Sequence, residues 1–87
     1  MNIDNIRDRL NEAGISTDDY MIGNAWEDRL CLVWDSNNAC WEVFYQERGK
    51  KQRLRVFDNE EAACYNLYSE LVQDYVMSMR LIPKGSQ

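Results

Sequence analysis

The sequence of residues 40–57 predicts a strand, a tight turn and a second strand, and this hairpin limits the possible folds more than any other stretch. Runs rich in aromatic and β-branched residues, "CWEVFYQ" and "RLRVF", flank Gly49. A turn centred on Gly49 and Lys50 would be of type II′, because glycine suits the first central position. Such a turn predicts the following cross-strand pairs: Arg48 with Lys51, Gln46 with Arg53, Tyr45 with Leu54, and Val43 with Val56.

The predicted register separates apolar side chains from mixed ones, because side chains alternate along a strand. If the strand "RLCLVWD" pairs Trp34 with Trp41, the apolar face comprises Leu30, Leu32, Trp34, Trp41, Val43, Tyr45, Leu54 and Val56. The opposite, mixed face comprises Cys31, Val33, Glu42, Phe44, Gln46, Arg53, Arg55 and Phe57. No helix is left to cover the mixed face, so Phe44, Phe57 and Val33 would form an exposed patch and a candidate binding surface.

Two helices are predicted, one on each side of the strands in the chain. Residues 2–15 carry apolar side chains at helical spacing and reach a glycine stop at Gly14. Residues 58–79 form a longer amphipathic helix with Asp58 or Asn59 as its cap.

The predicted fold follows from the order of these elements. A short strand is also expected at residues 20–23. The chain is therefore predicted to be one compact α+β domain over residues 1–82, followed by a C-terminal tail at residues 83–87. Its antiparallel sheet would have three to four strands, with the N-terminal and C-terminal helices packed on one face.

Charge and cysteine content restrict the partners and the compartment. Fifteen acidic residues outnumber ten basic ones and give a net charge of −5, which favours a basic protein partner and disfavours nucleic acid. The chain has an odd number of cysteines, and none has CxxC spacing: Cys31, Cys40 and Cys64. This pattern is typical of free thiols in a reducing compartment. The chain starts with an amphipathic segment, and no apolar run approaches the roughly 20 residues that cross a membrane. A cytoplasmic protein without membrane contact is expected.

Residues that usually carry catalysis or bind metals are scarce. The chain contains no histidine, which removes the commonest general base and metal ligand. Its scattered cysteines do not form a zinc motif, and its glycines are too dispersed for a phosphate-binding loop. Neighbouring carboxylates such as Asp18 and Asp19 lie in segments expected to be solvated turns. We therefore predict no catalytic residue, no metal, no cofactor and no enzymatic activity.

The segment Trp41–Cys64 resembles a known pattern. It contains "WEVFYQERG", then a short strand that ends in Phe57, then acidic residues and Ala-Ala-Cys at the start of a helix. This is similar to the "WxVYYxERG…F…E..AC" pattern of small immunity proteins from bacterial polymorphic-toxin and contact-dependent growth-inhibition systems. The similar stretch covers 24 of the 87 residues.

The resemblance implies a non-catalytic inhibitor. Such a protein binds and neutralises the toxic C-terminal domain of a cognate bacterial toxin inside the producing cell. Many of these toxins are nucleases with basic substrate clefts, which an acidic protein would complement. The resemblance assigns no contact residues, and it leaves a homo-oligomer possible without implying one.

Candidate contact residues come from the predicted loops and from the uncovered face of the sheet. An aromatic anchor ringed by charges is a common pattern of binding hot spots. The partner-binding candidates are Trp26, Glu27, Asp28, Asp35, Glu42, Phe44, Arg53 and Arg55.

Other functions remain open. A small cytosolic interaction or dimerisation module with no toxin partner would associate with itself through the uncovered face or the edge at residues 31–33. Bases could stack on Phe44 and Phe57 beside Arg53 and Arg55, although the net charge of the chain repels phosphate. An enzyme would need a deep pocket that shifts the pKa of a carboxyl group.

Overall fold

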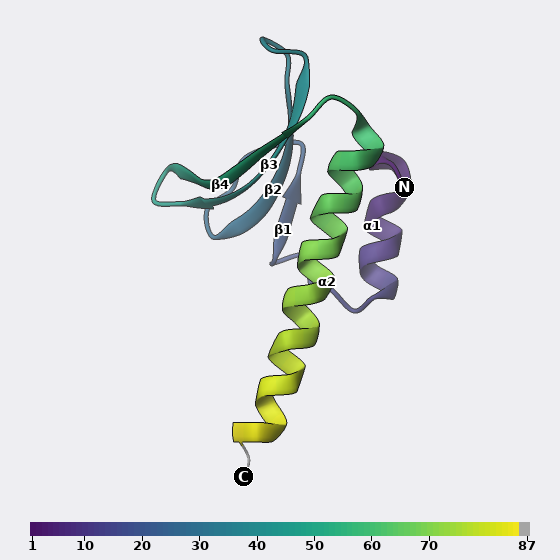
Figure 1. Ribbon diagram of the computed structural model, residues 1–87, viewed down its shortest axis with the longest axis vertical. Coiled ribbons are helices and arrows are strands. Elements are labelled where there is room, and N and C mark those ends of the chain that lie inside the picture. The colour runs from purple at the N-terminus through teal and green to yellow at the C-terminus, as the bar shows by residue number, and fades with distance from the viewer. Residues whose placement is uncertain (86–87) are drawn as a thin grey trace.

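The computed structural model describes the backbone of residues 1–85 and the side chains of residues 1–78. The protein is α+β, with a helix toward each terminus and a four-stranded mixed sheet between them in the chain (Figure 1). The elements are α1 (Ile3–Glu12), β1 (Tyr20–Ile22), β2 (Arg29–Asp35), β3 (Cys40–Glu47), β4 (Lys50–Phe57) and α2 (Glu60–Gly85). The strands lie in the order β1-β2-β3-β4.

Side-chain caps fix the starts of both helices. The side chain of Asn2 accepts a hydrogen bond from the N–H of Asn5, whose own side chain accepts one from the N–H of Asn2. Asn59 caps α2, as predicted, by accepting a hydrogen bond from the N–H of Ala62 at 2.7 Å. Gly14 has a φ of 82°, which confirms the predicted glycine stop after α1.

The sheet is not purely antiparallel, so this part of the fold prediction is wrong. β1 pairs parallel to β2, with Tyr20 opposite Leu30 and Ile22 opposite Leu32. A parallel neighbour requires a connection that returns along the length of the strand. Because β1 has only three residues, the return distance is about 10 Å, and residues 23–28 are sufficient. We name residues 23–28 the strap.

The hairpin predicted from β3 and β4 is present, but its turn is displaced. β2 and β3 pair in the predicted register, with Trp34 opposite Trp41. The centre of the β3–β4 turn is Arg48 and Gly49, with φ values of 53° and 73°, and does not include Lys50. Positive φ at both central residues makes the turn type I′, which suits the twist of a hairpin better than the mirror-image type I turn.

A β-bulge in β4 reverses the faces of its second half. The displaced turn alone would leave every side chain of β4 on its predicted face. It shifts the pairing of β4 with β3 by two residues, and side chains alternate between the faces with a period of two. Tyr45 pairs with Gln52, but Val43 pairs with Arg55, so β4 contains one extra residue between these pairs. Arg53 lies there with a φ of 52°. One extra residue moves every later side chain of β4 to the other face.

The bulge overturns the predicted exposed patch. Leu54 and Val56, predicted to be in the core, are 46% and 56% exposed. Phe57 packs against the core instead, on the face predicted for Leu54 and Val56. Phe44 keeps its predicted position opposite Cys31 but has no exposed surface.

One hydrophobic cluster joins both helices to the sheet. Its buried members are Ile6, Leu10, Ile15, Tyr20, Ile22, Leu30, Leu32, Val43, Ala63, Cys64, Leu67 and Leu71. Figure 1 shows α1 beside the first half of α2, while the second half of α2 extends past the sheet. α2 continues to Gly85 and therefore includes residues 83–85, which were predicted to lie in the C-terminal tail. Neither helix in residues 1–85 combines the length and the apolar character that a membrane span requires.

Candidate functional site

The residues predicted to contact a partner do not form one surface. Within the described structure they occupy three places. These are the strap (Trp26, Glu27 and Asp28), the face of the sheet that the strap crosses (Asp35, Glu42 and Phe44), and the side of β4 next to α2 (Arg53 and Arg55). We name the second place the strap-side face. Several of these groups are already bonded within the protein, which determines what each can do.

Glu27 holds the β3–β4 turn. Its Oε2 accepts a hydrogen bond from the N–H of Arg48, and its Oε1 accepts one from the N–H of Gly49, each at 2.7 Å. Hydrogen bonds to an ionised acceptor are stronger than neutral ones. The basic turn that connects β3 and β4 is therefore a structural contact of the strap, and both carboxylate oxygens of Glu27 are used in it.

A buried thiol holds the middle of the strap. The Sγ of Cys31 accepts a hydrogen bond from the N–H of Trp26 at 3.4 Å and lies 3.6 Å from the carbonyl oxygen of Trp26. Burial raises the pKa of the Cys31 thiol, so the group stays protonated and can donate to that oxygen. Trp26 is 54% exposed, and the Arg29 guanidinium lies 5.6 Å from the centroid of its ring. Trp26 therefore remains available to a partner.

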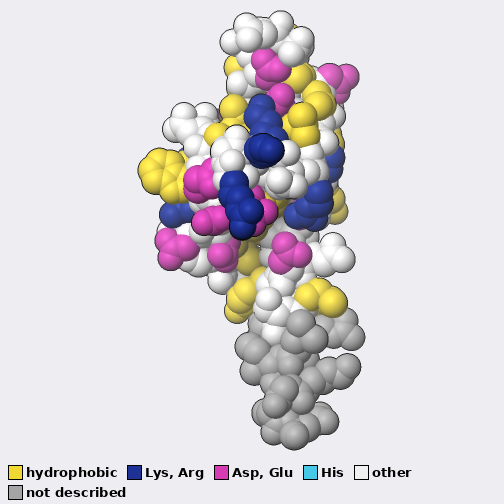
Figure 2. All heavy atoms as spheres, turned by 90° about the vertical axis from the view of Figure 1, so that its left-hand side faces the viewer, with side chains coloured by type: hydrophobic (Ala, Val, Ile, Leu, Met, Phe, Trp, Pro, Cys, Tyr) yellow, Lys and Arg dark blue, Asp and Glu magenta, His cyan; other side chains and the backbone are white. Residues whose placement is uncertain are grey.

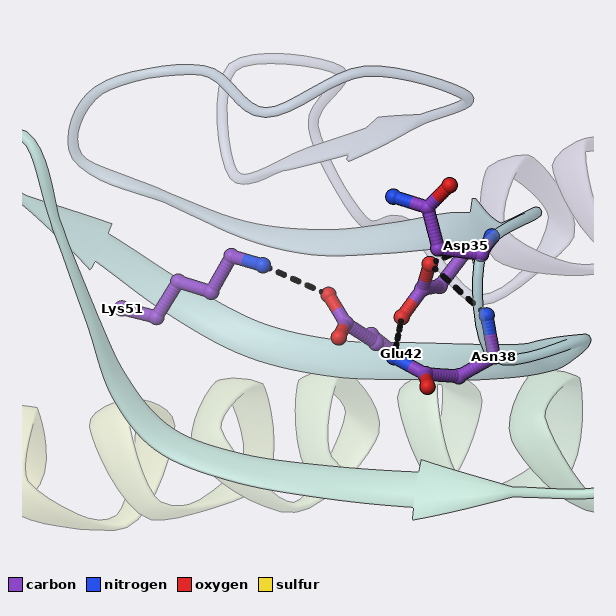
Figure 3. Close-up of polar contacts among 5 residues, drawn as sticks. Asp35, Asn38, Glu42 and Lys51 are labelled. Carbon is purple, nitrogen blue, oxygen red and sulfur yellow. Dashed lines mark hydrogen bonds and ion pairs between the residues drawn. The ribbon is translucent and has the colours of Figure 1, made fainter.

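Phe44 is covered by a charged pair on the strap-side face. The Lys51 Nζ lies 4.9 Å from the centroid of the Phe44 ring. It also donates a hydrogen bond to Glu42 Oε1 at 2.7 Å, which Figure 3 shows. The side chain of Glu42 is only 12% exposed. In this arrangement Phe44 acts as a core residue and Glu42 as an internal ion-pair partner.

Asp35 stabilises the turn between β2 and β3. Its Oδ1 accepts the N–H groups of Asn37 and Asn38 at 3.0 and 3.3 Å, and its Oδ2 accepts the side-chain amide of Asn38 at 2.8 Å (Figure 3). The hydrogen bond from the side chain of Asn38 is the main cause that lowers the pKa of Asp35 below its ordinary value. Asp35 is thus a turn residue whose charge is already solvated by its own loop.

The two candidate arginines of β4 face α2. Arg55 Nη2 lies 2.5 Å from Glu70 Oε2, and Arg53 Nη1 lies 3.6 Å from Glu70 Oε1. The Arg55 side chain is 29% exposed and the Arg53 side chain 64% exposed. The bulge at Arg53 places both guanidinium groups on this side, so the predicted stacking surface of arginines beside Phe44 does not exist.

A cleft of about 300 Å³ lies between one end of the sheet and α2. It is lined by Asp19, Asp28, Leu30, Tyr45, Arg53, Leu71, Asp74, Tyr75 and Ser78. The apolar part of the lining, Leu30 and Leu71, belongs to the hydrophobic core. Among the described residues, three carboxylates and one guanidinium supply its charge, and we name it the acidic cleft.

Among the described residues, the carboxylates of the acidic cleft form no ion pair within the protein. Among residues 1–78, no ion pair or side-chain hydrogen bond involves the carboxylate of Asp19, Asp28 or Asp74. Burial, and then the negative charge of Asp28, raises the pKa of Tyr45, so its hydroxyl stays protonated at neutral pH. In the described part of the chain, no group of three or more cysteine, aspartate and glutamate side chains is placed to hold a metal ion. The cleft therefore offers an excess of negative charge beside tyrosine rings.

Only two of the predicted contact residues, Asp28 and Arg53, line the acidic cleft. The sequence placed Tyr45 correctly on the apolar face, and Tyr75 lies in the amphipathic helix predicted over residues 58–79. Asp74, a charged residue beside Tyr75, was the available signal that this helix leaves the core here. The cleft also depends on where the sheet ends relative to α2, and this position cannot be predicted from the periodicity of the sequence.

Charges of both signs mix on the neighbouring surface. Figure 2 shows the side of the molecule that lies to the left in Figure 1, where acidic side chains surround several basic ones. The surface is therefore not uniformly acidic. The acidic cleft is a local feature, defined by its lining residues and not by the net charge alone.

Comparison with known protein families finds no match to this chain, and neither does comparison with curated proteins or with solved structures. The chemistry of the acidic cleft is therefore inferred from its own residues. Carboxylates beside tyrosine rings can bind an organic cation through ion pairs and through contact of the cation with the ring faces.

Proposed function

We propose that this protein is a non-catalytic inhibitor that binds and neutralises the toxic C-terminal domain of a bacterial toxin. The observation that carries the proposal is the acidic cleft, where three carboxylates that form no ion pair with the described residues lie beside Tyr45 and Tyr75. A toxic domain that acts on nucleic acid has a basic surface, which such a cleft complements. The resemblance of residues 41–64 to the immunity-protein pattern supports the same function.

The rest of the fold would hold the cleft in place. In this proposal both helices cover one face of the sheet, because Leu32 and Val43 share a buried cluster with Ile6 of α1 and Leu67 of α2. The strap and the Lys51 side chain close part of the opposite face. The end of the sheet next to α2 then leaves a charged cleft open to a partner.

The mode of action would be occupation of the partner's surface, with no turnover, metal or cofactor. The protein would act in the cytoplasm of the producing cell and would bind neither nucleic acid nor membrane. Its net charge of −5 would attract a basic domain from a distance and speed the encounter. The association rate should therefore fall as salt concentration rises.

Two linked experiments test this function. A tagged form of the protein should capture, from the cells that naturally produce it, one stoichiometric partner that is the C-terminal domain of a large secreted protein. Co-expression of the protein with that domain should then restore growth. The variant Asp28→Asn/Asp74→Asn should restore growth less well. If the wild-type protein binds the domain but growth is not restored, inhibition is the wrong function.

Exposed apolar residues on β4 favour a second candidate, a module that associates with itself. Leu54 and Val56 are exposed on an edge strand, and such strands can pair with another chain. The bulge at Arg53 and the charges of Lys50 and Lys51 are features that natural edge strands use against such pairing. Sedimentation equilibrium distinguishes the candidates. A dimer that Val56→Lys dissociates would support self-association, and a monomer would support the inhibitor.

A further inference from the structure

We infer that the acidic cleft binds the guanidinium group of a single arginine side chain supplied by the partner, and that this arginine is the central contact of the complex. The identity of the partner rests on the proposed function. The chemistry of the cleft does not, and it can be tested without the partner.

The size of the cleft suits one long side chain. Its volume of about 300 Å³ lies at the lower end of the roughly 300–1,000 Å³ of small-molecule sites. A helix or strand of a partner would not fit into this space, whereas one extended side chain would. The buried Leu30 and Leu71 provide apolar surface for the methylene groups of such a side chain.

The charges of the cleft require a cation. Asp19, Asp28 and Asp74 line it without an ion pair in the described structure, and the one cation in the lining, Arg53, lies 3.6 Å from Glu70. A guanidinium presents five N–H donors in a fixed plane and can bond two carboxylates at once or one in bidentate fashion. A set of separate carboxylates around one cavity is therefore better matched by arginine than by a single-point cation.

The tyrosines favour arginine over lysine. A guanidinium is flat, weakly hydrated and able to stack on aromatic faces, whereas an ammonium is compact and strongly hydrated. Tyr45 is half-buried in the sheet, and Tyr75 is 41% exposed. The hydroxyl of Tyr75 lies so close to Gly14 that a Cβ there would be 3.4 Å away, which limits the positions of the ring. The cleft thus has one aromatic wall from the sheet and one from α2.

The probe for this site is N-acetyl-L-arginine amide, titrated into isotope-labelled protein while backbone amide signals are followed by NMR. We expect saturable shifts at Asp28, Tyr45, Asp74 and Tyr75. The citrulline analogue has the same shape without the charge and should give no saturable shift. Absence of shifts at the cleft with the arginine probe, or equal binding of the citrulline or lysine analogue, would overturn the inference.

Variants identify the groups responsible. Asp28→Asn/Asp74→Asn should weaken binding of the arginine probe by about fivefold or more, because two ion pairs are lost. Asparagine is suitable at residue 28 because it tolerates the observed φ of 59°. The matched control, Asp4→Asn/Glu61→Gln, removes the same net charge at the N-terminal ends of the helices and should leave probe binding unchanged. Equal loss in both double variants would overturn the local site in favour of a general charge effect.

A second variant should strengthen binding. Arg53→Asn removes the cation that competes with the probe and keeps a residue that tolerates a φ of 52°. We expect about twofold tighter binding of the arginine probe, as for removal of one exposed like charge. Weaker binding would overturn the assignment of Arg53 as a competing cation in the cleft.

The two proposals fail separately. The probe experiment does not involve the toxin, so a negative result overturns the arginine site and leaves the inhibitor proposal standing. Failure of the wild-type protein to restore growth overturns the inhibitor proposal and leaves the arginine site standing.

Discussion

The strap region and the acidic cleft both carry carboxylates, but the fold uses them differently. Around the strap-side face each carboxylate is bonded internally, to turn amides or to Lys51. In the cleft, no such partner occurs among residues 1–78. The two sets are Glu27, Asp35 and Glu42 on the strap side and Asp19, Asp28 and Asp74 in the cleft. The comparison teaches that an acidic residue is available for binding only when the fold has not already used its charge.

The largest effect should come from the core of the strap side. Phe44→Ala removes a fully buried ring beneath Lys51 and should lower the free energy of unfolding by about 3–5 kcal/mol. Val56→Ala, on the same face but 56% exposed, should change it by no more than about 0.5 kcal/mol. Urea denaturation measures both. A small effect of Phe44→Ala would mean that the strap side is an open binding face after all.

The second effect concerns the buried thiol of Cys64, which belongs to the hydrophobic core on the helix side of the sheet. Burial is the main cause that raises the pKa of Cys64 to about 11. The folded state therefore holds this proton more tightly than the unfolded state, whose thiol titrates near pH 8.5. Stability from this group is complete below that pH and falls by about 3 kcal/mol as pH rises to about 11.

Denaturation at a series of alkaline pH values tests this expectation. The variant Cys64→Ala should lose the corresponding part of the pH dependence, while Cys40→Ala should retain it, because Cys40 is only half-buried. An unchanged pH dependence in Cys64→Ala would contradict the assigned burial of this thiol.

The strap should open when its hold on the turn is removed. Glu27→Ala leaves the N–H groups of Arg48 and Gly49 without their charged acceptor and should cost about 1–2 kcal/mol. Since Cys31 is bonded to the strap, its reaction with a thiol reagent should accelerate, and that of Cys64 should not. Equal acceleration of both thiols would indicate global unfolding and contradict a separate role for the strap.

The smallest effect on stability should come from the cleft. Asp74→Asn removes a carboxylate that has no ion pair among residues 1–78, so the free energy of unfolding should change by no more than about 0.5 kcal/mol. Thermal denaturation measures this change. A loss comparable to that of Glu27→Ala would mean that Asp74 supports the fold and is not reserved for binding.

The sequence predicted one hairpin correctly and misplaced the other for a local reason. Pairing Trp34 with Trp41 follows from the alternation of apolar residues and is confirmed. The bulge at Arg53 was not predictable, because a left-handed conformation is usually signalled by glycine or asparagine, and an arginine gives no such signal. The same reason applies to Arg48, whose left-handed conformation places the turn one position earlier than predicted.

The site was predictable only in part, because it depends on contacts between distant segments. Asp28 could be proposed from its place in an acidic loop, but its neighbours in the cleft come from β3, β4 and α2. The parallel pairing of β1 was missed because a return connection as short as residues 23–28 is unusual. That connection separates Glu27, which bonds the turn, from Asp28, which lines the cleft.

The most direct measurement is the affinity of matched variants for the partner domain captured by the tagged protein, determined by isothermal titration calorimetry. The cleft variant Asp28→Asn/Asp74→Asn should bind at least about tenfold more weakly than the wild-type protein. The control Asp4→Asn/Glu61→Gln, with the same net charge, should bind within about twofold of the wild type. Unchanged affinity of the cleft variant, or an equal loss in the control, would contradict the claim that the acidic cleft is the partner-binding site.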